Sequence, residues 1–111
     1  MPTSPSRALY RIVYPVNERP IFEIGRFAYE MIDCSERGLR YEVNDGIVPA
    51  LGTPLGGTLK FRSGSGVEVT GEVIRTLDGT VALALDPPGV PFSVILAEQR
   101  YLRSRGFNLR D

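Results

Sequence analysis

Apolar and polar residues alternate along most of the chain between residues 20 and 85. A period of two is typical of strands with one buried face. It predicts six strands, with the sequences PIFEI, RFAYEMI, LRYEV, TLKFR, VEVTGEVIRT and TVALAL. Gly71, inside the fifth of these, indicates a bend or bulge. Because no helical pattern separates the strands, the sequence predicts an antiparallel barrel or sandwich.

Two other stretches depart from this pattern. Residues 44–57, NDGIVPALGTPLGG, are too broken by glycine and proline to predict a regular element. Residues 89–106, GVPFSVILAEQRYLRSRG, predict a helix, with Pro91 in its first turn and Gly106 just beyond its end. This helix either covers one mouth of the barrel or binds a partner protein through a stripe of Phe92, Ile95, Leu96, Gln99 and Leu102.

Length and hydropathy indicate one folded domain in three parts. The 111 residues divide into a flexible N-terminal segment at 1–15, a β-barrel at 16–88 and the C-terminal helix at 89–106. No apolar run approaches the roughly 20 residues of a membrane span, and the N-terminus lacks the apolar core of a signal peptide. The single cysteine, Cys34, suits a reducing compartment. We therefore expect a cytoplasmic protein without a membrane span.

Charge and the choice of ionisable residues narrow the function. Thirteen basic residues balance 13 acidic ones, which argues against a general polyanion binder. Twelve of the basic residues are arginines, whose planar forks suit phosphate and guanine, although a GC-rich genome would also enrich arginine. The chain has no histidine, one cysteine and no clustered pair of carboxylates. We therefore expect neither an enzyme nor a metal site nor a bound cofactor.

Two short motifs contain the candidate binding residues. RALYR places Arg7 and Arg11 four positions apart, which two solvated arginines beside an apolar anchor would also explain. DCSERG contains Asp33, Ser35 and Gly38, the last of which is free to adopt a positive φ. A turn capped by its own side chains would account for the second motif without a ligand.

Together and in this order, the motifs resemble those of the PilZ domain family, which are RxxxR followed by D/NxSxxG. The resemblance spans essentially the whole chain. It implies an all-β fold with a C-terminal helix, built on a six-stranded antiparallel β-barrel of PilZ type. Members of the family bind cyclic di-GMP, a bacterial second messenger, and act as receptors rather than catalysts. The resemblance therefore implies cyclic di-GMP as the ligand and an unidentified downstream protein as the partner.

The family pattern also implies a role for each residue. Arg7 and Arg11 would wrap the ligand and donate to its phosphates and guanines. Asp33 and Ser35 would recognise the guanine edge, and Gly38 would let the backbone turn close beneath the ligand. Many members have a further arginine directly before RxxxR, where this chain has Ser6. Whether Arg37 or Arg40 contacts the ligand is left open by the sequence.

Two alternatives remain at this point. The chain could be a PilZ-like protein-interaction domain with weak or no cyclic di-GMP binding. It could also be a small barrel that binds single-stranded nucleic acid through arginine and tyrosine, although the zero net charge counts against nucleic acid. The intact motif residues favour the receptor.

Overall fold

The computed structural model describes residues 10–107. This part of the chain contains a 3₁₀ turn, η1 (Val16–Glu18), and a C-terminal helix, α2 (Phe92–Ser104). The strands are β1 (Ile12–Val13), β2 (Ile21–Ile24), β3 (Phe27–Cys34), β4 (Gly38–Glu42), β5 (Pro54–Lys60), β6 (Gly66–Leu77) and β7 (Thr80–Leu85).

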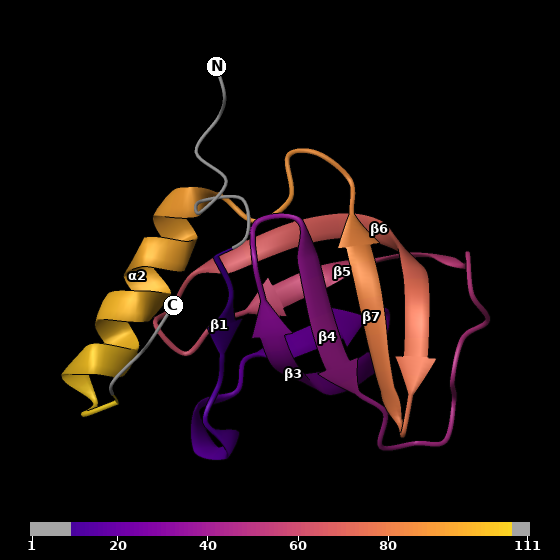
Figure 1. The fold of residues 1–111 in the computed structure, drawn as a ribbon, viewed down its shortest axis with the longest axis horizontal. Coiled ribbons are helices and arrows are strands. Elements are labelled where there is room, and N and C mark those ends of the chain that lie inside the picture. The colour runs from indigo at the N-terminus through magenta and orange to yellow at the C-terminus, as the bar shows by residue number, and fades with distance from the viewer. Residues whose placement is uncertain (1–9, 108–111) are drawn as a thin grey trace.

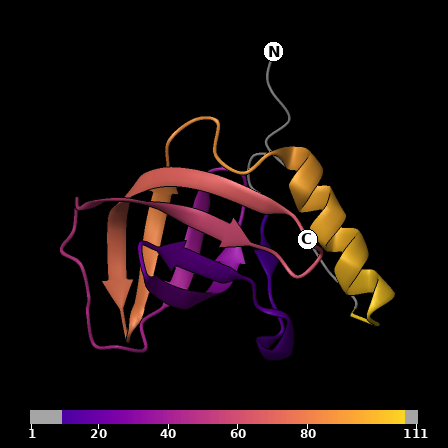
Figure 2. The same ribbon diagram turned by 180° about the vertical axis from the view of Figure 1, so that it is seen from behind.

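Six of the strands close into an antiparallel barrel. Each strand pairs with the next in the order β2, β3, β4, β7, β6 and β5, and β5 pairs with β2 to complete the circle. The short β1 pairs with the end of β3, beyond Ile21, the first residue of β2. Figures 1 and 2 show α2 lying beside the barrel, on the side where β1 runs. The prediction of a six-stranded antiparallel barrel followed by a helix is confirmed.

Aromatic and aliphatic side chains from every barrel strand fill the interior. Tyr41 of β4 lies at the centre of an aromatic group, with its ring 5.5 Å from that of Phe22 and 5.0 Å from that of Tyr29. Residues that the alternation places inward, such as Met31 and Leu59, are fully buried. Burial of this apolar surface is the main favourable contribution to folding.

Two elements differ from the sequence predictions. β5 begins at Pro54, inside the stretch that was predicted to be irregular. Its Gly57 passes so close to β2 that a Cβ atom would overlap the carbonyl oxygen of Glu23. Packing therefore requires glycine here, although glycine weakens the sequence pattern of a strand. Within the N-terminal segment predicted to be flexible at 1–15, residues 12–14 instead pack on the barrel, because Ile12 and Tyr14 are buried in the core.

Helix α2 packs on the barrel and is bound to it by a buried carboxylate. Ile95 and Leu102 of the predicted stripe are fully buried in the core cluster. Between them on the same face, Glu98 is also fully buried and accepts hydrogen bonds from the Tyr14 hydroxyl, at 2.8 Å, and from the Ser63 hydroxyl. The stripe therefore covers the barrel rather than facing a partner.

A second polar contact joins the end of α2 to η1. The buried Glu18 accepts hydrogen bonds from the Tyr101 hydroxyl at 2.9 Å and from Arg105 Nε at 3.3 Å. These bonds lower the pKa of Glu18, with the Tyr101 hydroxyl as the main cause. The segment that follows Arg11 is thus attached to α2 at two points.

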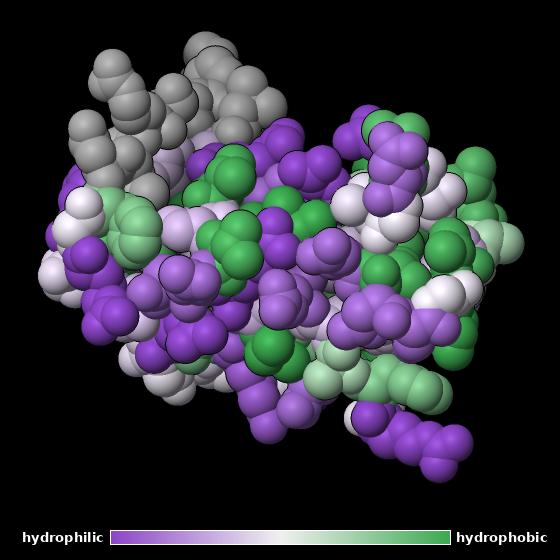
Figure 3. Space-filling view, turned by 90° about the horizontal axis from the view of Figure 1, so that it is seen from below, coloured by the Kyte–Doolittle hydropathy of each residue, from purple (hydrophilic) through white to green (hydrophobic). Residues whose placement is uncertain are grey.

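Apolar side chains also remain on the surface. Figure 3 shows several gathered toward the side of the molecule on which the β4–β5 connection lies. The exposed ones include Ile47, Val48 and Leu51 of this connection and Ile74 and Leu77 of β6. Within residues 10–107, no helix has the length and apolar character needed to cross a membrane.

Candidate functional site

The Asp33–Gly38 segment forms the corner between β3 and β4. The Ser35 amide donates to the Gly38 carbonyl over 2.8 Å and closes the turn. The backbone carbonyls of Glu36 and Arg37 accept from the amides of Val90 and Leu85, at 2.8 and 2.9 Å. The end of β7 and the connection from β7 to α2 therefore hold the corner in place through backbone hydrogen bonds.

Asp33 is a buried carboxylate held by arginine. Its side chain is only 6% exposed, and its Oδ2 atom accepts hydrogen bonds from Arg40 Nε at 3.0 Å and Arg40 Nη2 at 2.7 Å. Arg11 Nη1 lies 3.9 Å from the same oxygen, on a side chain that is 59% exposed. A buried carboxylate needs such partners, because an unpaired charge in the interior is strongly unfavourable.

The predicted site residues that the structure describes lie around one hollow on the outer face of the barrel. Its volume is about 110 Å³. The lining includes Arg11, Asp33, Ser35 and Gly38, together with Leu39, Arg40, Ile74, Arg75, Ala82 and Leu83. The fifth predicted residue, Arg7, lies outside the described residues.

Gly38 occupies the predicted place for a different physical reason. It does not have a positive φ, unlike Gly25 and Gly89, and it is the first residue of β4. A Cβ atom at this position would lie 3.4 Å from the Leu83 carbonyl oxygen and 3.7 Å from Ser35 Oγ. These are ordinary van der Waals distances, so a small side chain would fit: glycine here lowers the floor of the hollow but is not required for a left-handed turn.

The two arginines that the sequence left open have different environments. Arg40 lines the hollow and binds Asp33, whereas Arg37 Nε donates to the Leu85 carbonyl at 3.1 Å and supports the β7–α2 connection. Sequence reasoning did not identify Arg75, which joins the hollow from β6. The available signal was an arginine near the end of a strand in which apolar and polar residues alternate. Without the strand register, this signal does not tell which way the arginine side chain points.

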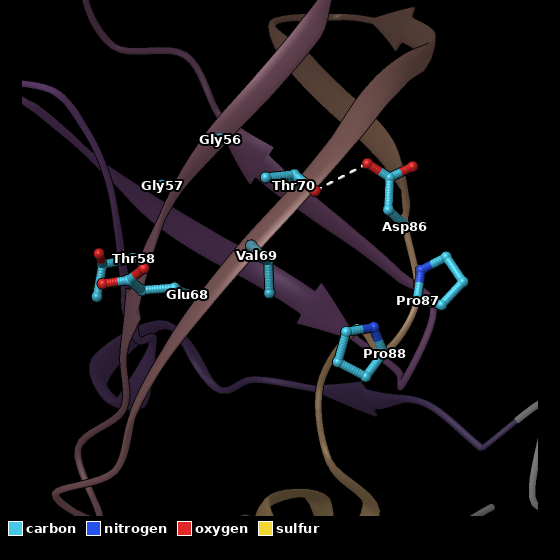
Figure 4. Close-up of a pocket in the computed structure, with 10 residues that line it drawn as sticks. Gly56, Gly57, Thr58, Glu68, Val69, Thr70, Asp86, Pro87 and Pro88 are labelled. Atoms are coloured by element: carbon cyan, nitrogen blue, oxygen red, sulfur yellow. Dashed lines mark hydrogen bonds between the residues drawn. The ribbon is translucent and has the colours of Figure 1, made fainter.

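A larger groove of about 550 Å³ lies on the outer side of β5 and β6, away from the predicted residues. Figure 4 shows its floor on these strands and Pro87 and Pro88 at one side, with Asp86 accepting a hydrogen bond from Thr70 at 2.8 Å. Its ionisable lining residues are Glu68 and Asp86, and none of its lining residues is an arginine. Two carboxylates repel phosphate, so the smaller, arginine-lined hollow is the better candidate for an anionic ligand.

Cys34, next to Asp33, faces the core and is fully buried. Burial raises the pKa of its thiol to about 12, which keeps it neutral and unreactive at ordinary pH. The same cause raises the pKa of Tyr29 to about 12, and it raises the pKa values of Tyr14 and Tyr41. Within residues 10–107, no three His, Cys, Asp or Glu residues form a group that could hold a metal ion.

These shifts predict a loss of stability in alkali. A group whose pKa is higher in the folded state gives its full stabilisation below its unfolded pKa and loses it as the pH rises through the folded value. For Cys34 this range runs from about 9 to about 12, with a slope of about 1.4 kcal/mol per pH unit. Urea unfolding at pH 8, 9.5 and 11 should show the decline, with a shallower slope in Cys34→Ala. Equal slopes in the two proteins would contradict the assignment.

Comparison with known proteins supports the fold and gives no function. No protein-family model and no curated protein matches the chain. Among solved structures, the crystal structure of an uncharacterized Legionella protein is similar, with a TM-score of 0.63 and 17% sequence identity. The match covers 88% of this chain and 99% of the Legionella protein. At this identity, what the two chains share is the barrel fold.

Proposed function

We propose that this protein is a receptor for cyclic di-GMP that passes the signal to a partner protein. The observation that supports the proposal most strongly is that Arg11, Asp33, Ser35 and Gly38 line one hollow, although the two motifs are separated by more than 20 positions in the sequence. The motifs match those of PilZ receptors in residue type and order. The proposal requires binding and a change in conformation, and it requires no catalysis.

The chemistry of the hollow suits an anionic nucleotide. Arg11 and Arg40 present guanidinium groups, which donate paired hydrogen bonds to phosphate or to the O6 and N7 atoms of guanine. Asp33 can accept from the N1–H and N2–H₂ groups of guanine. Both hydrogen bonds from Arg40 are accepted by the Oδ2 atom of Asp33, so these two bonds leave the Oδ1 atom of Asp33 unused.

The size of the hollow limits how much of the ligand can enter it. Its 110 Å³ is well below the roughly 300–1,000 Å³ of typical small-molecule sites. A cyclic dinucleotide would therefore insert one base edge and rest the remainder on the outer face of the barrel. The N-terminal segment, with Arg7 and Arg11, would supply the other contacts, and Arg11 is exposed and placed at the rim.

Titration calorimetry on the full chain tests this proposal. Cyclic di-GMP should bind, and GMP and GTP should bind far more weakly because they lack the paired phosphates and bases. Arg7→Ala and Arg11→Ala should each reduce affinity at least tenfold, because each removes charged hydrogen bonds worth about 1.5–3 kcal/mol. Arg103→Ala, which removes an exposed arginine on α2, is the matched control and should bind like the parent.

One observation favours the interaction-domain alternative. In the structure, Arg40 already satisfies Asp33 through two hydrogen bonds. A ligand must compete with this ion pair or use the remaining oxygen. If the parent shows no heat of binding at high micromolar cyclic di-GMP, the chain is a partner-binding domain. If it binds but both motif arginine variants bind equally well, the assigned site is wrong.

A further inference from the structure

A row of four paired residues crosses the outer face of the barrel. Asp33 of β3 pairs with Arg40 of β4, Arg40 pairs with Ala82 of β7, and Ala82 pairs with Arg75 of β6. Directly paired residues point to the same side of a sheet, and the next row points to the opposite side. The next row faces the core and is buried, and it consists of Cys34, Leu39, Leu83 and Val73. The row from Asp33 to Arg75 therefore faces outward.

Two β-bulges turn the ends of this row outward. Met31 is buried, so strict alternation would also point Asp33 into the core, but the register of β3 shifts between these two residues. In the same way Val73 is buried, and the register of β6 shifts before Arg75. A bulge adds one unpaired residue and redirects the side chains that follow it. In β6 the extra residue is Ile74, which is 55% exposed.

The hollow lies along this row, with Ala82 between two arginines. Arg40 and Arg75 stand two strand spacings apart, roughly 10 Å, and the short side chain of Ala82 leaves the space between them open. Three arginines line the hollow against a single carboxylate. Arg11 and Arg40 both lie within 4 Å of Asp33, whereas the side chain of Arg75 forms no ion pair or hydrogen bond with any residue in 10–107. Its charge has no partner in this part of the chain.

We propose that Arg75 and Ile74 form the second wall of the nucleotide site. Arg75 binds a phosphate of the ligand, and Ile74 packs against the flat face of a guanine. The inference rests on the proposed cyclic di-GMP function and adds two residues that neither motif contains. A cyclic dinucleotide has two phosphates, so Arg11 can hold one side while Arg75 holds the other. The guanidinium fork suits phosphate geometry, and an exposed isoleucine gains buried apolar area when a base covers it.

Calorimetric titration of the full chain with cyclic di-GMP tests the second wall. Arg75→Gln should raise Kd at least tenfold, and Arg75→Lys should restore only part of the affinity because it keeps the charge and loses the fork. Arg103→Gln removes the same charge from an exposed arginine on α2 and should change Kd less than twofold. Ile74→Ser should raise Kd about fivefold, whereas the equally exposed Leu77→Ser on the same strand should have no effect.

The outcomes separate this inference from the proposed function. If the parent binds and Arg11→Ala does not, but Arg75→Gln binds like the parent, the second wall is wrong and the receptor stands. If Arg103→Gln weakens binding as much as Arg75→Gln does, the effect is one of overall charge and the second wall is again overturned. If the parent does not bind cyclic di-GMP, both proposals fail together. Thermal melts of each variant, all altered at exposed positions, confirm that the fold is retained.

Discussion

Replacing Glu98 with alanine is expected to lower the free energy of unfolding by about 3 kcal/mol or more. The carboxylate is fully buried on α2 and accepts hydrogen bonds from Tyr14 and Ser63. The substitution removes bonds to a charged acceptor, worth about 1.5–3 kcal/mol each, and it leaves the buried Tyr14 hydroxyl without this partner. Urea unfolding followed by circular dichroism measures the loss.

A matched variant and a double-mutant cycle make this test specific. Glu98→Gln has the same shape and keeps one acceptor oxygen for Tyr14, so it should cost less than half as much. Tyr14→Phe removes only the hydroxyl, and the effects of Tyr14→Phe and Glu98→Ala should be clearly non-additive because the two groups share one bond. Additive effects would mean that the hydrogen bond does not join α2 to the N-terminal segment.

The barrel could be predicted from sequence wherever alternation directly reflects burial. In β7, every second residue from Val81 is apolar and buried, as the alternation predicts. In β3, Tyr29 and Met31 are buried as predicted, but Phe27, predicted to share their face, is 43% exposed. The start of β5 could not be predicted, because Gly57 is required by the close approach of β2, and a contact between distant segments leaves no local pattern. β1 was missed for a similar reason. It has only two residues, and Tyr14 next to it is held by the distant Glu98.

Strand irregularities limited the prediction more than strand locations did. Gly71 indicated a bend or bulge, but no bulge lies at this residue: it pairs regularly with Leu85 and Leu55, and a Cβ atom there would overlap the carbonyl of Ala84. The bulge lies three residues later, between Val73 and Arg75. Glycine in this strand therefore marks close packing, whereas a bulge can be made by any residue and here uses an isoleucine.

The candidate site was predictable only where residues are grouped in the sequence. Asp33, Ser35 and Gly38 form one short motif, and the structure brings Arg11 to them through the pairing of β1 with β3. Arg40 follows the motif closely, but its bond to Asp33 depends on the β3–β4 register. Arg75 reaches the hollow from a strand over 30 residues away, and its outward direction depends on the β6 bulge, so no sequence pattern identifies it.

Gly89→Ala is expected to disrupt the corner that supports the proposed site. Gly89 has a φ of +71°, and a Cβ atom there would overlap the carbonyl oxygen of Glu36, which accepts the Val90 amide at 2.8 Å. A left-handed alanine costs about 1–2 kcal/mol by itself, and relieving the overlap requires the β7–α2 connection to move away from the corner. We expect a total loss of about 2–5 kcal/mol, because overpacking adds roughly 1–3 kcal/mol to the backbone cost.

Gly46→Ala separates the two contributions to this loss. Gly46 has a similar φ of +77°, but its Cβ atom would meet no heavy atom within 4 Å, so only the backbone cost of about 1–2 kcal/mol should remain. Amide chemical shifts of Ser35 and Gly38 should change in Gly89→Ala and stay unchanged in Gly46→Ala. Under conditions where both variants are folded, cyclic di-GMP affinity should fall at least tenfold in Gly89→Ala alone, since only that substitution displaces the corner. Equal stability and equal affinity in the two variants would show that the corner does not depend on the connection behind it.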